Sequence, residues 1–195
     1  MRKLIIILSL TLAPVIASAS VIIPLAEPKL VAAADTVFWG TVVDITAQQD
    51  ANGFVTSLFK VQVYQGLKGT KLGDEVIIEV PGGDLNTGVS VAVTGSPRPN
   101  IGDMVFCFAE RHGQTLRPLG MSFGMLAIKQ EAGTNNLRVY RNLNGLQLTA
   151  KSGKAIDATN YMISGEKFDD FIARIEKQIQ ALPTQSAAKN SEVQK

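Results

Sequence analysis

The sequence has very few residues of the types that build disulfides and metal sites. Its 195 residues include a single cysteine, Cys107, and a single histidine, His112. One cysteine cannot form an internal disulfide, so an apolar core must hold the fold together. One histidine and one cysteine are too few ligands for a structural or catalytic zinc site. We therefore expect no metal and no cofactor.

Long apolar runs are absent beyond the N-terminus. There, Arg2 and Lys3 precede an apolar run from Leu4 to Leu12, and Ala17-Ser18-Ala19 offers the small residues that a signal peptidase binds. The alternative, a membrane anchor, is disfavoured because the run is short for a span of about 20 residues and Pro14 follows it within the same segment. Residues 1–19 are therefore predicted to be a signal peptide, and the mature protein to be periplasmic or extracellular without spanning the membrane.

The expected mature chain has no excess of charge of either sign, but its charge is unevenly distributed. Residues 20–109 hold five Lys or Arg and nine Asp or Glu, whereas residues 110–154 hold seven Lys or Arg and two Glu. Such asymmetry has two interpretations, an anion-binding face or an ordinary solvated basic surface. Nucleic acid is an unexpected partner for an exported protein.

Short strand-like segments dominate residues 36–141. "TVFWGTVVDITA" is rich in β-branched and aromatic residues, and Gly40 within it suggests a bulge or sharp bend. "FKVQVYQ" alternates apolar and polar residues, and "MVFCFA" is apolar on both faces, which is typical of a strand buried on both sides. Cys107 in this last segment is expected to be a buried, inert hydrophobe.

The only long helical pattern lies near the end of the chain. From Phe168 to Leu182 the apolar residues are spaced by three or four, which predicts an amphipathic helix over about residues 165–182. Ser164 is the expected N-cap, and Pro183 follows the helix. We expect a mainly β fold: a small OB-like Greek-key barrel with extra hairpin strands and one C-terminal amphipathic helix. It forms a single domain over residues 20–182, followed by a disordered tail, residues 183–195.

Four segments carry a resemblance to a known family. They are "AADTVFWGTVVDI", "FKVQVYQGLKG", "LGDEVIIEVPGG" and "IGDMVFCFAER", in that order. Over roughly residues 33–130 the chain resembles the netrin-module and metalloproteinase-inhibitor type of OB-fold, and most closely exported bacterial proteins of that type. These motifs are turns and core positions, so the resemblance implies a fold and a binding role.

The resemblance carries over no inhibitory residue. In the inhibitor family an N-terminal cysteine chelates the protease zinc, whereas the expected mature chain begins Ser20-Val21. An inhibitor would reduce the activity of metalloproteases when added in excess.

The stretch "GMSFG", residues 120–124, matches the G-x-S-x-G pattern around nucleophilic serines. That pattern requires a strand-to-helix turn and a histidine later in the chain, but "MLAIKQE" after it alternates like a strand and His112 comes before it. With Glu110 behind His112, a triad in the opposite chain order remains conceivable. The competing interpretation is that both glycines serve tight turns while Met121 and Phe123 fill the core.

The basic half of the chain supplies a candidate binding face. Its expected members are Arg111, Arg117, Lys129, Arg138 and Tyr140. OB-folds use such faces for oligosaccharides and oligonucleotides, and for an exported protein an anionic glycan or a lipid head group is the better match.

Four hypotheses follow. The first is an exported, non-enzymatic binding module with an unknown protein partner. The second is an inhibitor-like protein, the third an anionic glycan or lipid head-group binder, and the fourth a serine hydrolase that uses Ser122.

Overall fold

The computed structural model describes residues 20–141, 143 and 146–183. The expected signal peptide, residues 1–19, lies outside the described residues, as does the expected tail apart from Pro183. Of the helices that are described, none is both long and apolar enough to cross a membrane.

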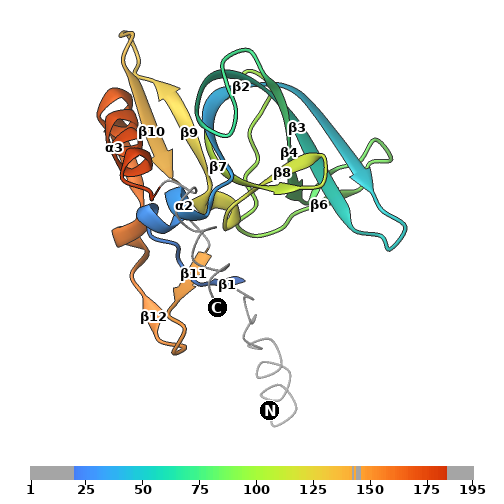
Figure 1. Cartoon of the computed structure of the whole chain (residues 1–195). Coiled ribbons are helices and arrows are strands. Elements are labelled where there is room, and N and C mark those ends of the chain that lie inside the picture. Colours follow the sequence, from blue (N-terminus) through green and yellow to red (C-terminus); the bar gives the residue numbers. More distant parts are fainter. Residues whose placement is uncertain (1–19, 142, 144–145, 184–195) are drawn as a thin grey trace, which may run out of the picture.

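The chain is mainly β, with one short helix near its beginning and one longer helix near its end (Figure 1). The strands are β1 (Ser20–Ile22), β2 (Thr36–Gln49), β3 (Val55–Lys68), β4 (Glu75–Pro81), β5 (Gly83–Asp84), β6 (Ser90–Val91), β7 (Met104–His112), β8 (Thr115–Pro118), β9 (Met125–Gln130), β10 (Leu137–Arg141), β11 (Leu146–Thr149), β12 (Ala155–Ile156) and β13 (Ile163–Lys167). The helices are α2 (Glu27–Ala33) and α3 (Phe168–Gln180), with 3-10 turns η1 (Met121–Phe123) and η2 (Ala158–Tyr161).

Eight strands form one mixed sheet in the order β13-β10-β9-β7-β2-β3-β4-β8. Its last strand, β8, also pairs with β7, so the pairings run from β2 through β3, β4, β8 and β7 and return to β2. We call this the closed path. All of its pairs are antiparallel except β4 with β8, which are parallel at Ile78 and Leu116. Strands β9, β10 and β13 continue the sheet outside the path and form an arm.

Gly40 lies at an irregular point of β2, as expected. The register between β2 and β3 shifts between Trp39 and Gly40. A Cβ atom on Gly40 would lie 2.1 Å from the carbonyl oxygen of Gln62, so no larger residue fits here without moving β3. The predicted bulge is therefore confirmed, and its cause is the close approach of two backbones.

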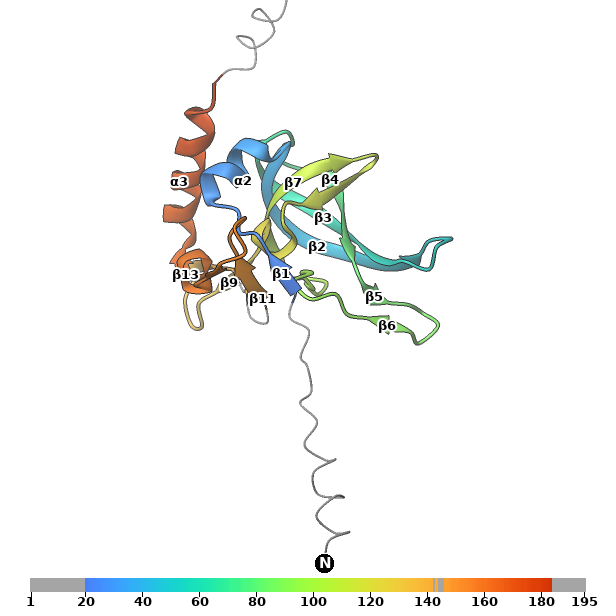
Figure 2. The same ribbon diagram turned by 90° about the horizontal axis from the view of Figure 1, so that it is seen from below.

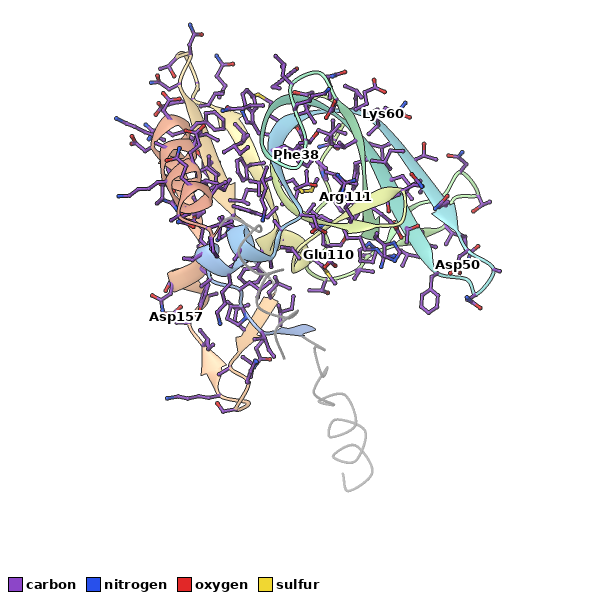
Figure 3. The ribbon with its side chains drawn as sticks, viewed as in Figure 1. Phe38, Asp50, Lys60, Glu110, Arg111 and Asp157 are labelled. Carbon is purple, nitrogen blue, oxygen red and sulfur yellow. The ribbon has the colours of Figure 1, made fainter. Side chains whose placement is uncertain are left out.

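Two cores lie on opposite faces of β2 and β7. The inner core lies inside the closed path, where Figure 3 shows Phe38 among the strands of the path. Its members include Phe38, Phe59, Val61, Ile78, Val105, Cys107 and Leu116. The helix-side core contains Val37, Phe106, Phe108, Leu126, Val139, Phe171 and Ile175 among others. Successive residues of β7 thus alternate between the two cores, which confirms the prediction that this strand is buried on both faces.

Helix α3 docks on the arm and on α2, beside which it lies in both ribbon views (Figures 1 and 2). Phe171 packs edge-on against Phe106, with ring centroids 4.9 Å apart. The prediction that Ser164 caps this helix is wrong. Residues 163–167 pair with β10 as β13, and the residue at the N-cap is Lys167, which makes no side-chain capping bond. Strand pairing satisfies these backbone groups instead of the helix.

A small sheet lies beside the lower end of the arm. It joins β1, β11 and β12 (Figure 1), with β1 parallel to β11. The segment that connects β6 to β7 passes nearby, since a Cβ on Gly95 would lie 2.8 Å from Leu146 of β11. We call residues 95–103 the strap.

Candidate functional site

A cavity of about 780 Å³ lies between the strap and the arm. Ala127 of β9 is in register with Val105 of β7, and Tyr140 of β10 is in register with Ala127. Residues directly opposite in an antiparallel pair share a face, so this face of the arm continues the face of β7 that fills the inner core. Because the arm lies outside the closed path, none of the described strands of that path covers this face, and the strap covers it in part. We call the cavity the cleft.

The cleft is lined by polar and apolar side chains from several parts of the chain. The strap contributes Gly95, Ser96, Pro97, Arg98, Pro99, Asn100 and Asp103 to the lining. The other lining residues are Met104 and Val105 of β7, Ser122 of η1, Met125, Leu126, Ala127, Ile128 and Lys129 of β9, Tyr140 and Arg141 of β10, Leu146 of β11, Met162, and Ile163 and Ser164 of β13. Its volume lies within the usual range for small-molecule sites, about 300–1,000 Å³. A smaller cavity of about 370 Å³ lies on the other side of Arg98, Pro99 and Asn100.

Ser122 holds one end of the strap. Its hydroxyl donates a hydrogen bond to the carbonyl oxygen of Gly95 over 2.7 Å, and its backbone N–H donates to the same oxygen over 3.0 Å. Ser96 fixes the neighbouring position by donating to the carbonyl oxygen of Pro81 over 2.7 Å. These bonds keep the wall of the cleft in place, which is a structural role for the serine of GMSFG.

The two glycines of GMSFG serve the backbone, as the competing interpretation proposed. Gly120 has φ 63°, and a Cβ on Gly124 would lie 2.4 Å from the backbone nitrogen of Leu119. Phe123 is fully buried in the helix-side core, as expected, whereas Met121 is only half-buried and is not part of either core. Met121 has φ 57°, a conformation that residues with a side chain rarely adopt. The stretch forms the 3-10 turn η1 and leads into strand β9, so it lacks the helix that a nucleophile elbow requires.

His112 has a partner other than the one expected. Its Nδ1 lies 3.4 Å from Oε2 of Glu79 on β4, and within the described residues it forms no ion pair with Glu110. The Ser122 hydroxyl donates to Gly95 and does not contact the imidazole. Ser122 and His112 therefore belong to two different hydrogen-bonding groups.

Glu79 is the centre of a polar cluster on the outer side of the closed path. Arg117 Nη2 donates to it over 2.9 Å and the Thr115 hydroxyl over 2.9 Å. Burial opposes ionisation of Glu79, but these two hydrogen bonds and the charges of Arg117 and His112 outweigh it, so the pKa of Glu79 lies below 4.5. This cluster ties β4 to β7 and β8, where the closed path has its parallel pair.

Positive side chains predominate among the ionisable groups of the cleft. Arg98, Lys129 and Arg141 line it, and Asp103 is the one acid in the lining. The carboxylate of Asp103 accepts hydrogen bonds from the backbone N–H and side chain of Asn100, at 2.8 and 3.4 Å. Arg98 is partly neutralised, because it lies 3.9 Å from Asp84 and donates to the carbonyl oxygen of Val91. Lys129 forms no ion pair with any residue that the structure describes.

Arg141 is a buried cation beneath the cleft wall. It is 4% exposed, and its Nη1 donates to the carbonyl oxygen of Tyr161 over 3.3 Å. Its Nε and Nη2 have no hydrogen-bond partner within the described ranges. The nearby carboxylates of Glu27 and Glu166 are both bound by Arg174. Burial is the main cause that lowers the pKa of Arg141 to about 10. At neutral pH this side chain is therefore a buried cation that forms no ion pair within the described residues, although the charges of Glu27 and Glu166 act on it.

Three cations lie in a row across the arm. Arg138 of β10 is in register with Lys129 of β9 and with Lys167 of β13, so all three are on one face. Glu131 pairs with Arg138 over 3.2 Å, and this hydrogen bond is the main cause of a pKa of Glu131 below its ordinary value. One acid for three cations leaves this cation row with an excess of positive charge.

The five residues expected to form one anion-binding face divide into two groups. Lys129, Arg138 and Tyr140 lie together on the arm, and Lys129 Nζ is 5.8 Å from the centroid of the Tyr140 ring. Arg117 is bound to Glu79, and Arg111 lies near it on β7, with its Nη2 3.4 Å from the carbonyl oxygen of Gly69. Figure 3 shows Arg111 and Glu110 beside β8, away from the arm. Of these two groups, the arm group is the one beside the cleft, and its Lys129 forms no ion pair with a described residue.

Sequence reasoning missed Ser164, Lys167 and the strap as parts of this site. Ser164 and Lys167 were assigned to a helix start, although Gly165 between them signalled a strand irregularity. A Cβ on Gly165 would lie 3.2 Å from the Tyr140 hydroxyl oxygen, so this glycine makes room for Tyr140. The strap "GSPRPNIGD" has the composition of an ordinary loop, and nothing local reveals what it covers.

Cys107 is fully buried in the inner core, as expected. Burial raises the pKa of its thiol far above the ordinary value, which keeps the thiol protonated at neutral pH. No group of three or more His, Cys, Asp or Glu side chains suited to a metal ion occurs in the described part of the chain.

No known protein family model matches this chain, and no curated protein is similar to it at a significant level.

Proposed function

We propose that the protein is an exported, non-enzymatic binding module and that its ligand occupies the cleft. The proposed framework is an OB-like barrel formed by the closed path β2-β3-β4-β8-β7, with the arm as an addition. In support, five strands pair in a closed circuit, and one of the five pairs is a single parallel contact, as suits a small, partly open Greek-key barrel.

The observation that carries the proposal is the uncovered face of the arm. Val105 of β7 and Ala127 of β9 lie side by side on one sheet face. On β7 this face packs into the inner core, whereas from Ala127 onward it lines the cleft. The cavity has its own wall, because Ser122 and Ser96 hold the strap at fixed hydrogen bonds. A preformed cavity with a fixed wall requires little ordering on binding, which favours ligand capture.

A non-enzymatic role fits the burial and the bonding partners of the chemically reactive side chains. The Ser122 hydroxyl holds the strap, the Cys107 thiol is buried, and His112 lies beside Glu79 on another part of the surface. The cleft is thus lined by groups that bind and position, such as hydroxyls, an amide, an ammonium and thioethers.

The test is a substitution that fills the cleft. Ala127 lies on its floor, so Ala127→Trp places an indole in the space of the ligand. The control is Ala132→Trp in the exposed β9–β10 turn. Purified wild-type protein and both variants are incubated with an envelope extract of the source cells, and retained small molecules are identified by mass spectrometry.

We expect wild type and Ala132→Trp to retain the same compound and Ala127→Trp to lose at least nine-tenths of it, on the order of a tenfold loss of affinity. Equal retention by Ala127→Trp, with native thermal unfolding, would place the ligand elsewhere and refute the proposal.

A further inference from the structure

The inference concerns which chemical group the cleft binds, and it rests on the proposed function. Three hydrogen-bond donors lie on one face of the arm, where the cleft meets the cation row. They are the ammonium of Lys129, the hydroxyl of Tyr140 and the hydroxyl of Ser164, from β9, β10 and β13. None of the three donates to another side chain or carbonyl group of the described residues.

The strand register puts these donors side by side. Tyr140 is directly opposite Ser164, and Lys129 lies over the Tyr140 ring. Neighbouring strands are about 4.8 Å apart, so donors on three adjacent strands span a group of a few atoms. Gly165 keeps the Tyr140 hydroxyl in this position, because a methyl group there would approach it to 3.2 Å.

The charges around these donors favour a negative partner. Lys129, Arg138 and Lys167 face one another across the register with Glu131 as the one acid paired to them. Like charges opposite one another destabilise a sheet, so an anion bound among them relieves repulsion. Arg141 adds a buried positive charge beneath the wall, and its Nε and Nη2 have no hydrogen-bond partner among the described residues. The only acid in the lining, Asp103, is already engaged by Asn100.

We propose that Lys129, Tyr140 and Ser164 form an oxyanion site for the phosphate or carboxylate group of a sugar-sized ligand, whose hydroxylated body occupies the rest of the cleft. An ammonium with two hydroxyls provides charge-assisted donors to such an oxygen cluster. Ser96, Ser122 and Asn100 offer acceptors to hydroxyl groups, while Met104, Met125 and Met162 contact the carbon skeleton. A volume of about 780 Å³ suits one or two rings.

The site differs from the surface by which OB-folds bind oligosaccharides, which is the outer face of the second and third barrel strands. In this chain that face belongs to β3 and β4 and carries Lys60 opposite Ile77 and Gln62 opposite Glu75. Its charges are mixed, whereas the cation row and the cleft carry an excess of one sign.

The experiment compares matched ligands by isothermal titration calorimetry. Glucuronate and glucose 6-phosphate are the anionic probes, and glucose is the neutral control of the same size. The variants are Lys129→Met and Tyr140→Phe, which remove the ammonium or the hydroxyl while keeping the apolar part. Lys60→Met on the outer face of β3 removes one positive charge at a distance from the cleft and is the matched control.

We expect at least one anionic probe to bind while glucose binds about tenfold more weakly or not at all. Lys129→Met should weaken the anion about tenfold, Tyr140→Phe a few-fold, and Lys60→Met less than twofold. Failure of wild type to bind either anion, or an unchanged affinity in Lys129→Met, overturns the inference.

Binding to lipid vesicles tests whether the oxyanion belongs to a lipid head group or to a soluble sugar derivative. Binding to phosphatidylglycerol vesicles, lost in Lys129→Met and absent with phosphatidylcholine, assigns the anion to a lipid head group; binding of the soluble probes alone assigns it to a free sugar derivative. If Ala127→Trp loses the envelope compound while Lys129→Met retains it, the cleft is the binding site but the oxyanion inference is wrong.

Discussion

Glu79 shows how a single side chain depends on neighbours that are distant in sequence. It lies on β4, and its carboxylate contacts Thr115, Arg117 and His112 of β7 and β8. Alternation along "EVIIEV" places Glu79 on the outer face, opposite the buried Ile78 and Val80, and that much follows from the sequence. The hydrogen-bond partners of Glu79 do not follow from the sequence, because they lie near it only once β8 pairs beside β4 in the closed path.

The depressed pKa of Glu79 makes stability depend on pH. The folded state holds the ionised form, so the stabilisation is complete above the unfolded value of about 4.5 and is lost as pH falls through the lower folded value. We expect Glu79→Gln to lower the free energy of unfolding by about 1 kcal/mol at pH 7, because Arg117 is partly screened by solvent. The difference from wild type should shrink as pH falls from 5 to 3.

Urea unfolding at several pH values measures this prediction. Glu75→Gln, an exposed position on the same strand, is the control and should have little effect at any pH. A Glu79→Gln difference that stays constant between pH 7 and pH 3 would show that the carboxylate charge is not the stabilising feature.

At the scale of elements, α3 decides whether the arm is stable. The arm has one face against α3 and the other in the cleft, and the helix contributes Phe168, Phe171, Ile172 and Ile175 to the helix-side core. The sequence predicted this helix and its apolar stripe well, since periodicity is a local property. Its first turn was misplaced because pairing of β13 with β10 competes for residues 163–167.

Truncation of the central contact tests the docking of α3. Phe171 is fully buried and packs on Phe106, so Phe171→Ala should destabilise the protein by about 3–5 kcal/mol. Asp170→Ala, on the exposed side of the same helix, should change stability by less than about 0.5 kcal/mol. Both values come from denaturant unfolding followed by circular dichroism. Equal effects of the two substitutions would mean that α3 does not depend on this core.

At the scale of the whole molecule, the sheet has a closed and an open part. Strands β2, β3 and β7 have neighbours on both edges and contribute to one or both cores. Strands β1, β11 and β12 form a separate three-stranded sheet of short strands. Short strands with few paired groups open at low cost, so stability should be distributed unevenly over the fold.

Hydrogen exchange followed by mass spectrometry tests this distribution. We expect amides of β2, β3 and β7 to exchange only through global unfolding, and those of β1, β11 and β12 to exchange at least about a hundredfold faster through local opening. Comparable protection in both regions would show instead that the small sheet and the closed path unfold as one unit.

The sequence alone determined those features that depend on local spacing. These are the mainly β character, the two-sided burial of β7, the bulge at Gly40, the C-terminal helix and the burial of Cys107, because alternation, helical period and glycine preference act between near neighbours. The position and the lining of the cleft were decided only by the tertiary structure. The cleft exists because the path closes through β8 and leaves the arm uncovered, and because the strap crosses it. Lys129, Tyr140 and Ser164 share one face through the register of β9, β10 and β13, which is set only when these strands pair.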